Sequence, residues 1–201
     1  MHKEKRETSE VKSFIILSLA ALLLIFFVTS SGTYNFAATE KHWKITEKLI
    51  TWARVSSIAA HSKNLEVPTI DEAETFMAGA RHYNAMCIIC HLAPGLEPSD
   101  LSVGLYPQAP LFFKRAPVTE EKEKLKMIKE YFWVIKNGIK MTAMPAWGPT
   151  HDDEFVWAMA VFVHKLHGMT AEEYGEFAVT GHDHEHDDHQ HDSDLLPLES
   201  F

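Results

Sequence analysis

The most continuous hydrophobic segment of the chain lies near its N-terminus, where Phe14 to Val28 contains no charged residue. Four basic residues precede this segment, namely Lys3, Lys5, Arg6 and Lys12, and the next basic residue after it is Lys41. Lysine and arginine gather on the cytoplasmic side of membrane-spanning helices. We therefore predict a cytoplasmic N-terminus at 1–12, a single transmembrane anchor at 13–30, and an exported body.

The length of this segment leaves a second interpretation open. Counted from Val11 to Thr29 it approaches the roughly 20 residues that a spanning helix needs. Counted more strictly, it fits the apolar part of a cleaved signal peptide followed by small residues such as Ser30 and Gly32. We favour the uncleaved anchor, and both interpretations place the body across the membrane.

The next hydrophobic pattern, at 38–62, has the period of an amphipathic helix. Ile45, Leu49, Trp52 and Ala59 recur at the spacings that bring side chains onto one helical face. This helix is expected to rest on the body or at the membrane surface, or else to contact a membrane partner. We assign 31–68 as a linker that contains it and that ends at Pro68.

Helical patterns dominate the remaining chain, and no alternating segment predicts a strand. A capping box at Thr69 and Glu72 opens a helix that runs toward Cys87. Proline and glycine make 88–118 mostly loop. Further helices are expected to open near Thr119, Thr150 and Thr170, and the first two to end at Gly138 and Gly168, respectively. The body is therefore predicted to be all-α.

Charge excludes one class of partner. The net charge is −9, and residues 182–194 contribute six acidic groups without a lysine or arginine. Nucleic acid is not an expected partner, because phosphate binding requires a basic face. Hydrophobic residues make up 46% of the chain, which is enough for a globular core.

The only two cysteines, Cys87 and Cys90, are followed directly by His91. A disulfide, half of a zinc site and covalent haem attachment are the three interpretations of this spacing. A redox disulfide of this spacing normally belongs to a fold with a β-sheet, and a structural zinc site needs four ligands that the body does not supply. Cys-x-x-Cys-His is the attachment pattern of c-type haem, in which two thiols bind the vinyl groups and the imidazole binds the iron.

Two methionines in the segment GIKMTAMPAWG, residues 138–148, are candidates for a second iron ligand. A thioether is a soft, neutral ligand suited to an electron carrier. Met144 is the better candidate because Pro145 stiffens the chain after it, and Met141 is the competitor.

On these motifs the chain resembles the class I cytochromes c, specifically the single-haem, membrane-anchored kind grouped with the cytochrome subunits of cbb3-type oxidases. The resemblance rests on GARHYNAMCIICH, GLYPQAP, KNGIKMTAMPAWG and DDEFVWAMAVFVHKL. It implies a class I cytochrome c fold at 69–180 around one haem c. Thioethers from Cys87 and Cys90 would bind the haem covalently, with His91 as the proximal and Met144 as the distal iron ligand.

The resemblance also suggests roles for residues around the haem. It implies that Gly79 meets Trp157 where the terminal helices cross, and that the region of Pro94 orients His91. Leu92 departs from many relatives, which carry glycine after the histidine. Residues expected to line a haem face, or else to pack in the core, are Tyr106, Pro107 and Leu111. Residues expected near the propionates are Trp133, Lys140 and Trp147.

The C-terminal segment 181–201 is expected to be a disordered tail rich in histidine and aspartate. Its histidines are His182, His184, His186, His189 and His191. Imidazoles and carboxylates at this density would bind copper, zinc or nickel weakly and reversibly. The alternative is a soluble tail in which chelation is incidental.

These patterns predict an electron carrier and no catalysis, because no acid–base pair, nucleophile or open coordination position is evident. We expect it in the inner membrane, with the haem domain periplasmic, in a respiratory chain beside an oxidase or dehydrogenase complex. One alternative is a metal-handling or metal-sensing haem protein that uses the tail. The other is a haem enzyme in which Met144 leaves the iron.

Overall fold

The structure is a computed structural model that describes residues 2–68 and 72–179. All regular structure in these ranges is helical, which confirms the all-α prediction. In chain order the elements are α1 (His2–Ser30), α2 (Lys44–Ser62), α3 (Glu72–His82), the π-helical turn η1 (Tyr83–Cys87), α4 (Ile88–His91), α5 (Asp100–Gly104), the 3-10 turn η2 (Phe112–Lys114), α6 (Glu121–Asn137), α7 (Asp153–Lys165) and α8 (Ala171–Val179).

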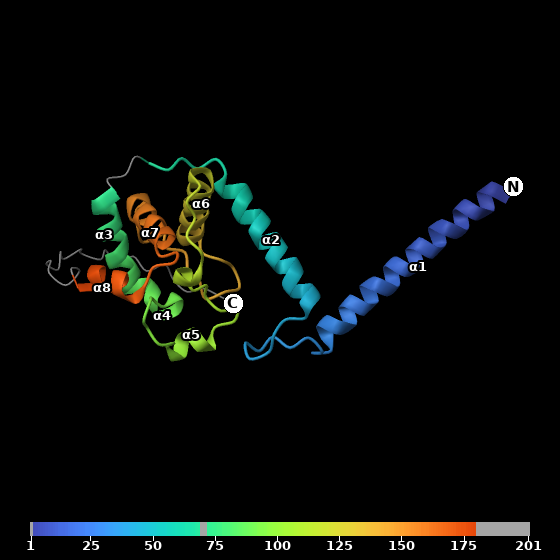
Figure 1. The fold of residues 1–201 in the computed structure, drawn as a ribbon. Helices are drawn as coiled ribbons and strands as arrows, with labels where there is room; N and C mark the ends of the chain where they lie inside the picture. The colour runs from blue at the N-terminus through green and yellow to red at the C-terminus, as the bar shows by residue number, and fades with distance from the viewer. Residues whose placement is uncertain (1, 69–71, 180–201) are drawn as a thin grey trace.

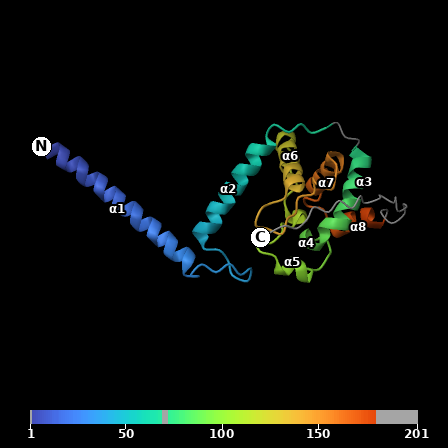
Figure 2. The same cartoon turned by 180° about the vertical axis from the view of Figure 1, so that it is seen from behind.

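The N-terminal helix α1 stands apart from the other elements. In Figures 1 and 2, α1 projects from a body formed by α3 to α8, and α2 lies between the two. Within α1, Glu10–Ser30 is the one described segment long and apolar enough to cross a membrane. Its side chains are exposed in the protein, as those of a lipid-facing helix would be.

The core of the body forms where α7 crosses α3 and α6. Its largest fully buried side chains are those of Tyr83, Val156, Met159, Phe162 and Leu166. The ring of Trp157 stacks on that of Phe132 in α6, with 3.8 Å between ring centroids. Aromatic stacking of this kind adds to the free energy gained by burying the rings.

Gly79 allows α3 and α7 to approach each other closely. A Cβ atom at this position would overlap the carbonyl oxygen of Ala158 and come within 2.7 Å of the Cβ of Phe162. The expectation that Gly79 meets Trp157 is therefore wrong by one helical position. Successive residues point about 100° apart on a helix, so Ala158 faces α3 while Trp157 faces α6.

Helix boundaries follow the capping chemistry of the sequence with corrections at three helix starts and one helix end. The helix predicted to open near Thr150 begins at Asp153, after the cap residue Asp152, and it ends at Lys165, before Gly168. Gly138 ends α6 with φ 65°, a conformation that favours glycine, as predicted. The α6 cap is the side chain of Glu120, which accepts from the backbone of Glu123 at 3.0 Å, and Thr119 is not the cap. The helix predicted from residue 38 begins only at Lys44.

The two predicted capping boxes have different outcomes. The Thr170 hydroxyl accepts from the Glu173 backbone at 3.2 Å, while the Glu173 carboxylate accepts from the Thr170 backbone at 2.8 Å. This reciprocal pair confirms the capping box before α8. The box at Thr69 and Glu72 lies partly outside the described residues.

Two histidines close the C-terminal end of α7 inside the core. His164 and His167 are 7% and 6% exposed, with 5.3 Å between their ring centroids. Burial, together with the neighbouring His164 and Arg115, lowers the pKa of His167 to about 4. Both rings are therefore expected to be neutral at pH 7.

Replacing Gly79 by alanine should destabilise the body, because the added methyl group meets a backbone carbonyl that cannot rotate away. We expect the free energy of unfolding to fall by about 3 kcal/mol, at the upper end of overpacking effects. Chemical denaturation followed by circular dichroism would measure it. Gly175→Ala is the control, since nothing lies within 4 Å of its Cβ position, and there stability should rise slightly.

Stability should also depend on pH through His167. The unfolded chain binds a proton near pH 6.5 and the folded protein only near pH 4, so acid favours unfolding within this window. Between pH 6.5 and 4, we expect the free energy of unfolding of the wild type to fall by about 2 kcal/mol more than that of His167→Phe. Above pH 6.5, the two proteins should show the same dependence on pH. Parallel pH profiles for the two proteins would contradict this assignment.

Candidate functional site

The cysteine motif lies on one continuous helical segment whose geometry changes just before it. α3 passes into the π-helical turn η1, and α4 then ends at His91. The turn η1 ends at Cys87, and α4 carries Cys90. Single π-helical turns interrupt α-helices frequently at functional sites, because they change the direction in which the following side chains point.

A buried hydrogen bond holds the end of α4 in place. The hydroxyl of Tyr83, whose side chain has no exposed surface, donates to the carbonyl oxygen of Leu92 at 2.7 Å. Leu92 has φ 55°, a left-handed conformation that favours glycine and strains a leucine. The hydrogen bond thus stabilises the sharp turn that follows His91.

The two thiols are half-buried and are not joined in a disulfide. Burial, together with the negative charge of a Cys90 thiolate, raises the pKa of Cys87 to about 12. Redox-active cysteine pairs depend instead on a lowered pKa that exposes a thiolate at neutral pH. The environment of Cys87 therefore disfavours thiol–disulfide chemistry and suits an apolar attachment site.

The imidazole of His91 is fixed in both orientation and tautomer. Its Nδ1 lies 2.9 Å from the carbonyl oxygen of Pro110, which can only accept a hydrogen bond. The proton is therefore on Nδ1, and Nε2 keeps the lone pair with which histidine binds a metal. Burial lowers the pKa of His91 and keeps it neutral, as ligation requires.

An aromatic ring completes the environment of this imidazole. Phe112 of η2 stacks on His91 with 4.8 Å between ring centroids and 22° between ring planes. The sequence-based expectation that the region of Pro94 orients His91 is wrong. The residues that do so, Pro110 and Phe112, lie 19 and 21 positions along the chain from His91.

The loop between α6 and α7 separates the two methionine candidates. Met144 is half-buried and packs against the core, whereas Met141 is 88% exposed with φ 58°. The loop is closed by Ile139, whose backbone donates to the Met144 carbonyl at 3.1 Å, and by the Thr142 hydroxyl, which accepts from the Met144 backbone at 3.1 Å. Of the two sulfurs, only that of Met144 belongs to a side chain packed on the core.

A half-buried donor set of this kind fits a c-type haem. One small helical body contains two unpaired thiols, a neutral imidazole with a free lone pair and a half-buried thioether. Zinc fits less well, because the described residues contain no group of three histidine, cysteine or acidic side chains placed to hold a metal ion.

The remaining predicted haem neighbours take different positions. The Tyr106 hydroxyl accepts from the backbone of His42 at 2.8 Å, and Trp133 stacks on His61 of α2 with 5.4 Å between centroids. These two residues therefore attach the linker to the body. Of the others, Leu111 and Trp147 are half-buried, while Pro107 and Lys140 are exposed.

A polar chain that sequence reasoning missed runs behind Phe112. Arg115 lies 5.2 Å from the centre of the Phe112 ring and donates to the Tyr131 hydroxyl at 2.6 Å. The Tyr131 oxygen lies 2.8 Å from Nε2 of His167. No local pattern could have revealed this chain, because its members come from η2, α6 and the end of α7.

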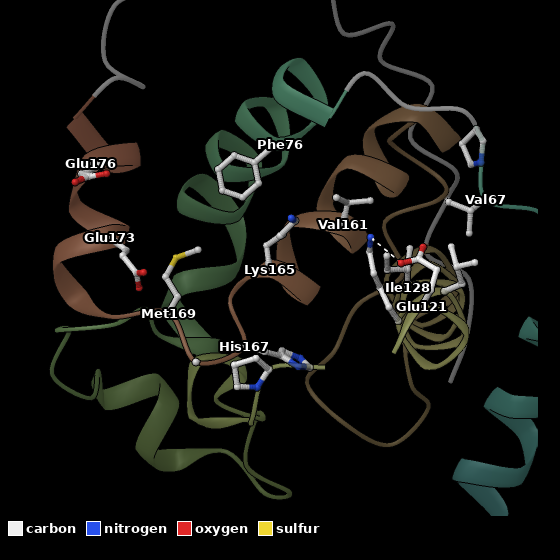
Figure 3. A pocket seen from close by; sticks show the side chains of 15 residues that line it. Val67, Phe76, Glu121, Ile128, Val161, Lys165, His167, Met169, Glu173 and Glu176 are labelled. Carbon is white, nitrogen blue, oxygen red and sulfur yellow. Dashed lines mark hydrogen bonds and ion pairs between the residues drawn. The ribbon is translucent and has the colours of Figure 1, made fainter. Parts of the chain in front are cut away.

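A groove lined by other residues lies elsewhere in the body. It has a volume of about 930 Å³ and opens between α3, α6, α7 and α8, where Phe76, Val161, Lys165 and Met169 line it (Figure 3). Neither cysteine of the motif, nor His91 or Met144, contributes to its lining. The tail histidines 182 to 191 lie outside the described residues.

Comparison with known proteins identifies one family. Residues 74–163 match the family model described as cytochrome C oxidase, cbb3-type, subunit III. No curated protein and no solved structure matches the chain. The matched segment contains the cysteine motif, His91, the methionine loop and most of α7. Residues 74–163 therefore resemble the cytochrome c domain of this family, and this match is consistent with a class I c-type cytochrome.

Proposed function

We propose that the protein is a one-electron carrier with one haem c, bound through Cys87 and Cys90 and ligated by His91 and Met144. The observation that carries this proposal is the fixed orientation of the His91 imidazole. Its Nδ1 forms a hydrogen bond with the Pro110 carbonyl oxygen, and its ring stacks on Phe112. A metal-binding histidine normally uses its second nitrogen in this way, which fixes the ring and increases its basicity.

Haem supplies an iron that cycles between two oxidation states. The protein contributes two neutral ligands from separate elements, His91 at the end of α4 and Met144 in the loop before α7. Neither side chain needs to change its protonation state when the electron moves. A thioether ligand also raises the reduction potential relative to a second imidazole.

The surroundings of His91 support the same role. Phe112 is 8% exposed and keeps water away from one face of the imidazole. Arg115 lies 5.2 Å from the centre of the Phe112 ring, and burial together with the positive charge of Arg115 lowers the pKa of His91. The same charge disfavours the additional positive charge of the oxidised site, so it raises the reduction potential.

Membrane attachment by α1 is part of the proposal. Glu10–Ser30 is long enough to span a bilayer, and the basic residues before it favour a cytoplasmic N-terminus. The haem domain would then be periplasmic and would exchange electrons with a respiratory oxidase or dehydrogenase complex. The family of residues 74–163 supports a redox complex as the partner.

Replacing Met144 by alanine should open a coordination position, whereas Met141→Ala should not, because the Met141 side chain points into solvent. We expect the Met144 variant to bind carbon monoxide rapidly when reduced. Its reduction potential should fall by on the order of 0.1 V, within the roughly 0.8 V that axial ligands span. Optical spectroscopy with carbon monoxide and a redox titration would measure both.

The outcomes of this comparison separate the candidate functions. Slow carbon monoxide binding by the wild type and by Met141→Ala supports an electron carrier with permanent methionine ligation. Rapid binding by the wild type would contradict that assignment and would favour the haem enzyme in which Met144 leaves the iron.

A further inference from the structure

The apolar stripe of α2 faces away from the body of the protein. Ile45, Leu49 and Trp52 follow one another at spacings of four and three residues, so they share one face of the helix. Their exposed fractions are 72%, 60% and 68%, and that of the adjacent Val55 is 57%. A surface helix normally turns such a stripe toward the core, so this one requires another explanation.

A different face of α2 makes the contact with the body. Ser62 is buried, Arg54 and Ile58 are half-buried, and the His61 ring stacks on Trp133 of α6. These contacts lie on the side of α2 opposite the stripe. The helix can therefore keep its contacts with the body while the stripe faces away from it. Among the described residues, none covers the stripe.

The segment that joins α1 to α2 is aromatic and partly exposed. Tyr34 lies against Phe36 and Trp43, each with 5.0 Å between ring centroids. Phe36 is 78% and Trp43 is 46% exposed. Tyrosine and tryptophan are enriched where a membrane-spanning segment enters the headgroup region, which is the position that this cluster has next to α1.

This aromatic segment is also attached to the body. The Tyr34 hydroxyl lies 2.6 Å from Nδ1 of His42, and the His42 backbone donates to the Tyr106 hydroxyl at 2.8 Å. Tyr106 belongs to the loop that leads to Pro110, the residue that orients His91. The linker is therefore connected to the body at both ends, through Tyr106 and through Trp133.

The direction of α2 agrees with a position on a membrane surface. In Figures 1 and 2, α2 runs across the direction of α1 and does not continue along it, and the body lies on the other side of α2. A helix that runs across a spanning helix lies along the bilayer plane. Lys44 and Lys48 accompany the stripe in the first turns of α2, where they would meet anionic headgroups.

We propose that α2 is an interfacial helix whose stripe of Ile45, Leu49, Trp52 and Val55 inserts into the bilayer surface. This inference rests on the proposed anchoring by α1 and adds a second contact to it. We assign lipid as the partner that covers the stripe. The aromatic cluster connects the stripe to α1 along the chain, and lysines lie beside the stripe. Two contacts hold the haem domain in one orientation above the membrane.

Two adjacent serines allow a matched test. Ser56 lies four residues after Trp52 and therefore on the stripe, whereas Ser57 points about 100° away, and both are exposed. In the full-length holoprotein the native cysteines are occupied by haem, so Ser56→Cys and Ser57→Cys can each receive one nitroxide label. Vesicles of phosphatidylethanolamine and phosphatidylglycerol provide the membrane, and Leu22→Cys reports on α1.

The measurement compares collisions of each label with oxygen, which concentrates in lipid, and with a water-soluble nickel complex. We expect the oxygen-to-nickel ratio at position 56 to exceed that at position 57 by about threefold or more, as for a helix face inserted in the interface. Adding Leu49→Glu to the Ser56→Cys protein should reduce the ratio at position 56 toward that at position 57. The haem spectrum confirms that each variant is folded.

Three results would overturn the proposal in distinguishable ways. Equal ratios at positions 56 and 57, with position 22 still in lipid, would refute the interfacial helix and leave the anchor intact. Exposure of position 22 to the nickel complex would refute the anchor itself. Spectral broadening by neighbouring labels at position 56 would show that a second copy covers the stripe.

Discussion

The close crossing of α3 and α7 at Gly79 is the constraint on which the rest of the body depends. Because glycine lets the two backbones approach, Phe162 packs against the rings of Phe76 and Tyr83 on the α3 side, at 5.2 and 5.4 Å between centroids. Tyr83 is thereby fully buried with its hydroxyl on the Leu92 carbonyl. His91 directly precedes Leu92. Its position therefore depends on the crossing of α3 and α7 at Gly79, twelve residues earlier in the chain.

The surroundings of His91 combine an apolar enclosure with a fixed positive charge. Phe112 contacts both the imidazole and Arg115, and Arg115 is held by Tyr131, which in turn contacts His167. An arginine stays charged at every physiological pH, and burial keeps His167 neutral at pH 7. The charge close to the proposed iron ligand is therefore constant under ordinary conditions, which suits a carrier with a stable potential.

Local sequence patterns predicted the elements well, whereas contacts between distant segments could not be predicted. The end of α6 at Gly138 and the capping box of Thr170 and Glu173 depend on neighbouring residues, and the structure confirms both. The α7 partner of Gly79 depends on the rotation of one helix against another. A shift of one residue, from Trp157 to Ala158, was enough to make that prediction wrong.

The candidate site shows the same division. Cys87, Cys90 and His91 lie within five residues, so their motif can be recognised from the sequence alone. Their role in haem binding remains a prediction. The choice of Met144 over Met141 rested on Pro145, and the burial of Met144 now supports it. Pro110 was one of several prolines in the loop, and nothing in the sequence distinguished the one whose carbonyl meets His91. The period of α2 likewise predicted a stripe but not the direction it faces.

The mass of the full-length protein, measured under denaturing conditions after purification from its native membranes, tests the central claim most directly. Covalent attachment through Cys87 and Cys90 predicts a polypeptide heavier by one haem, and the added mass should persist after acid extraction of loosely bound cofactor. The mass of the bare polypeptide, with both thiols free or joined in a disulfide, would contradict the account.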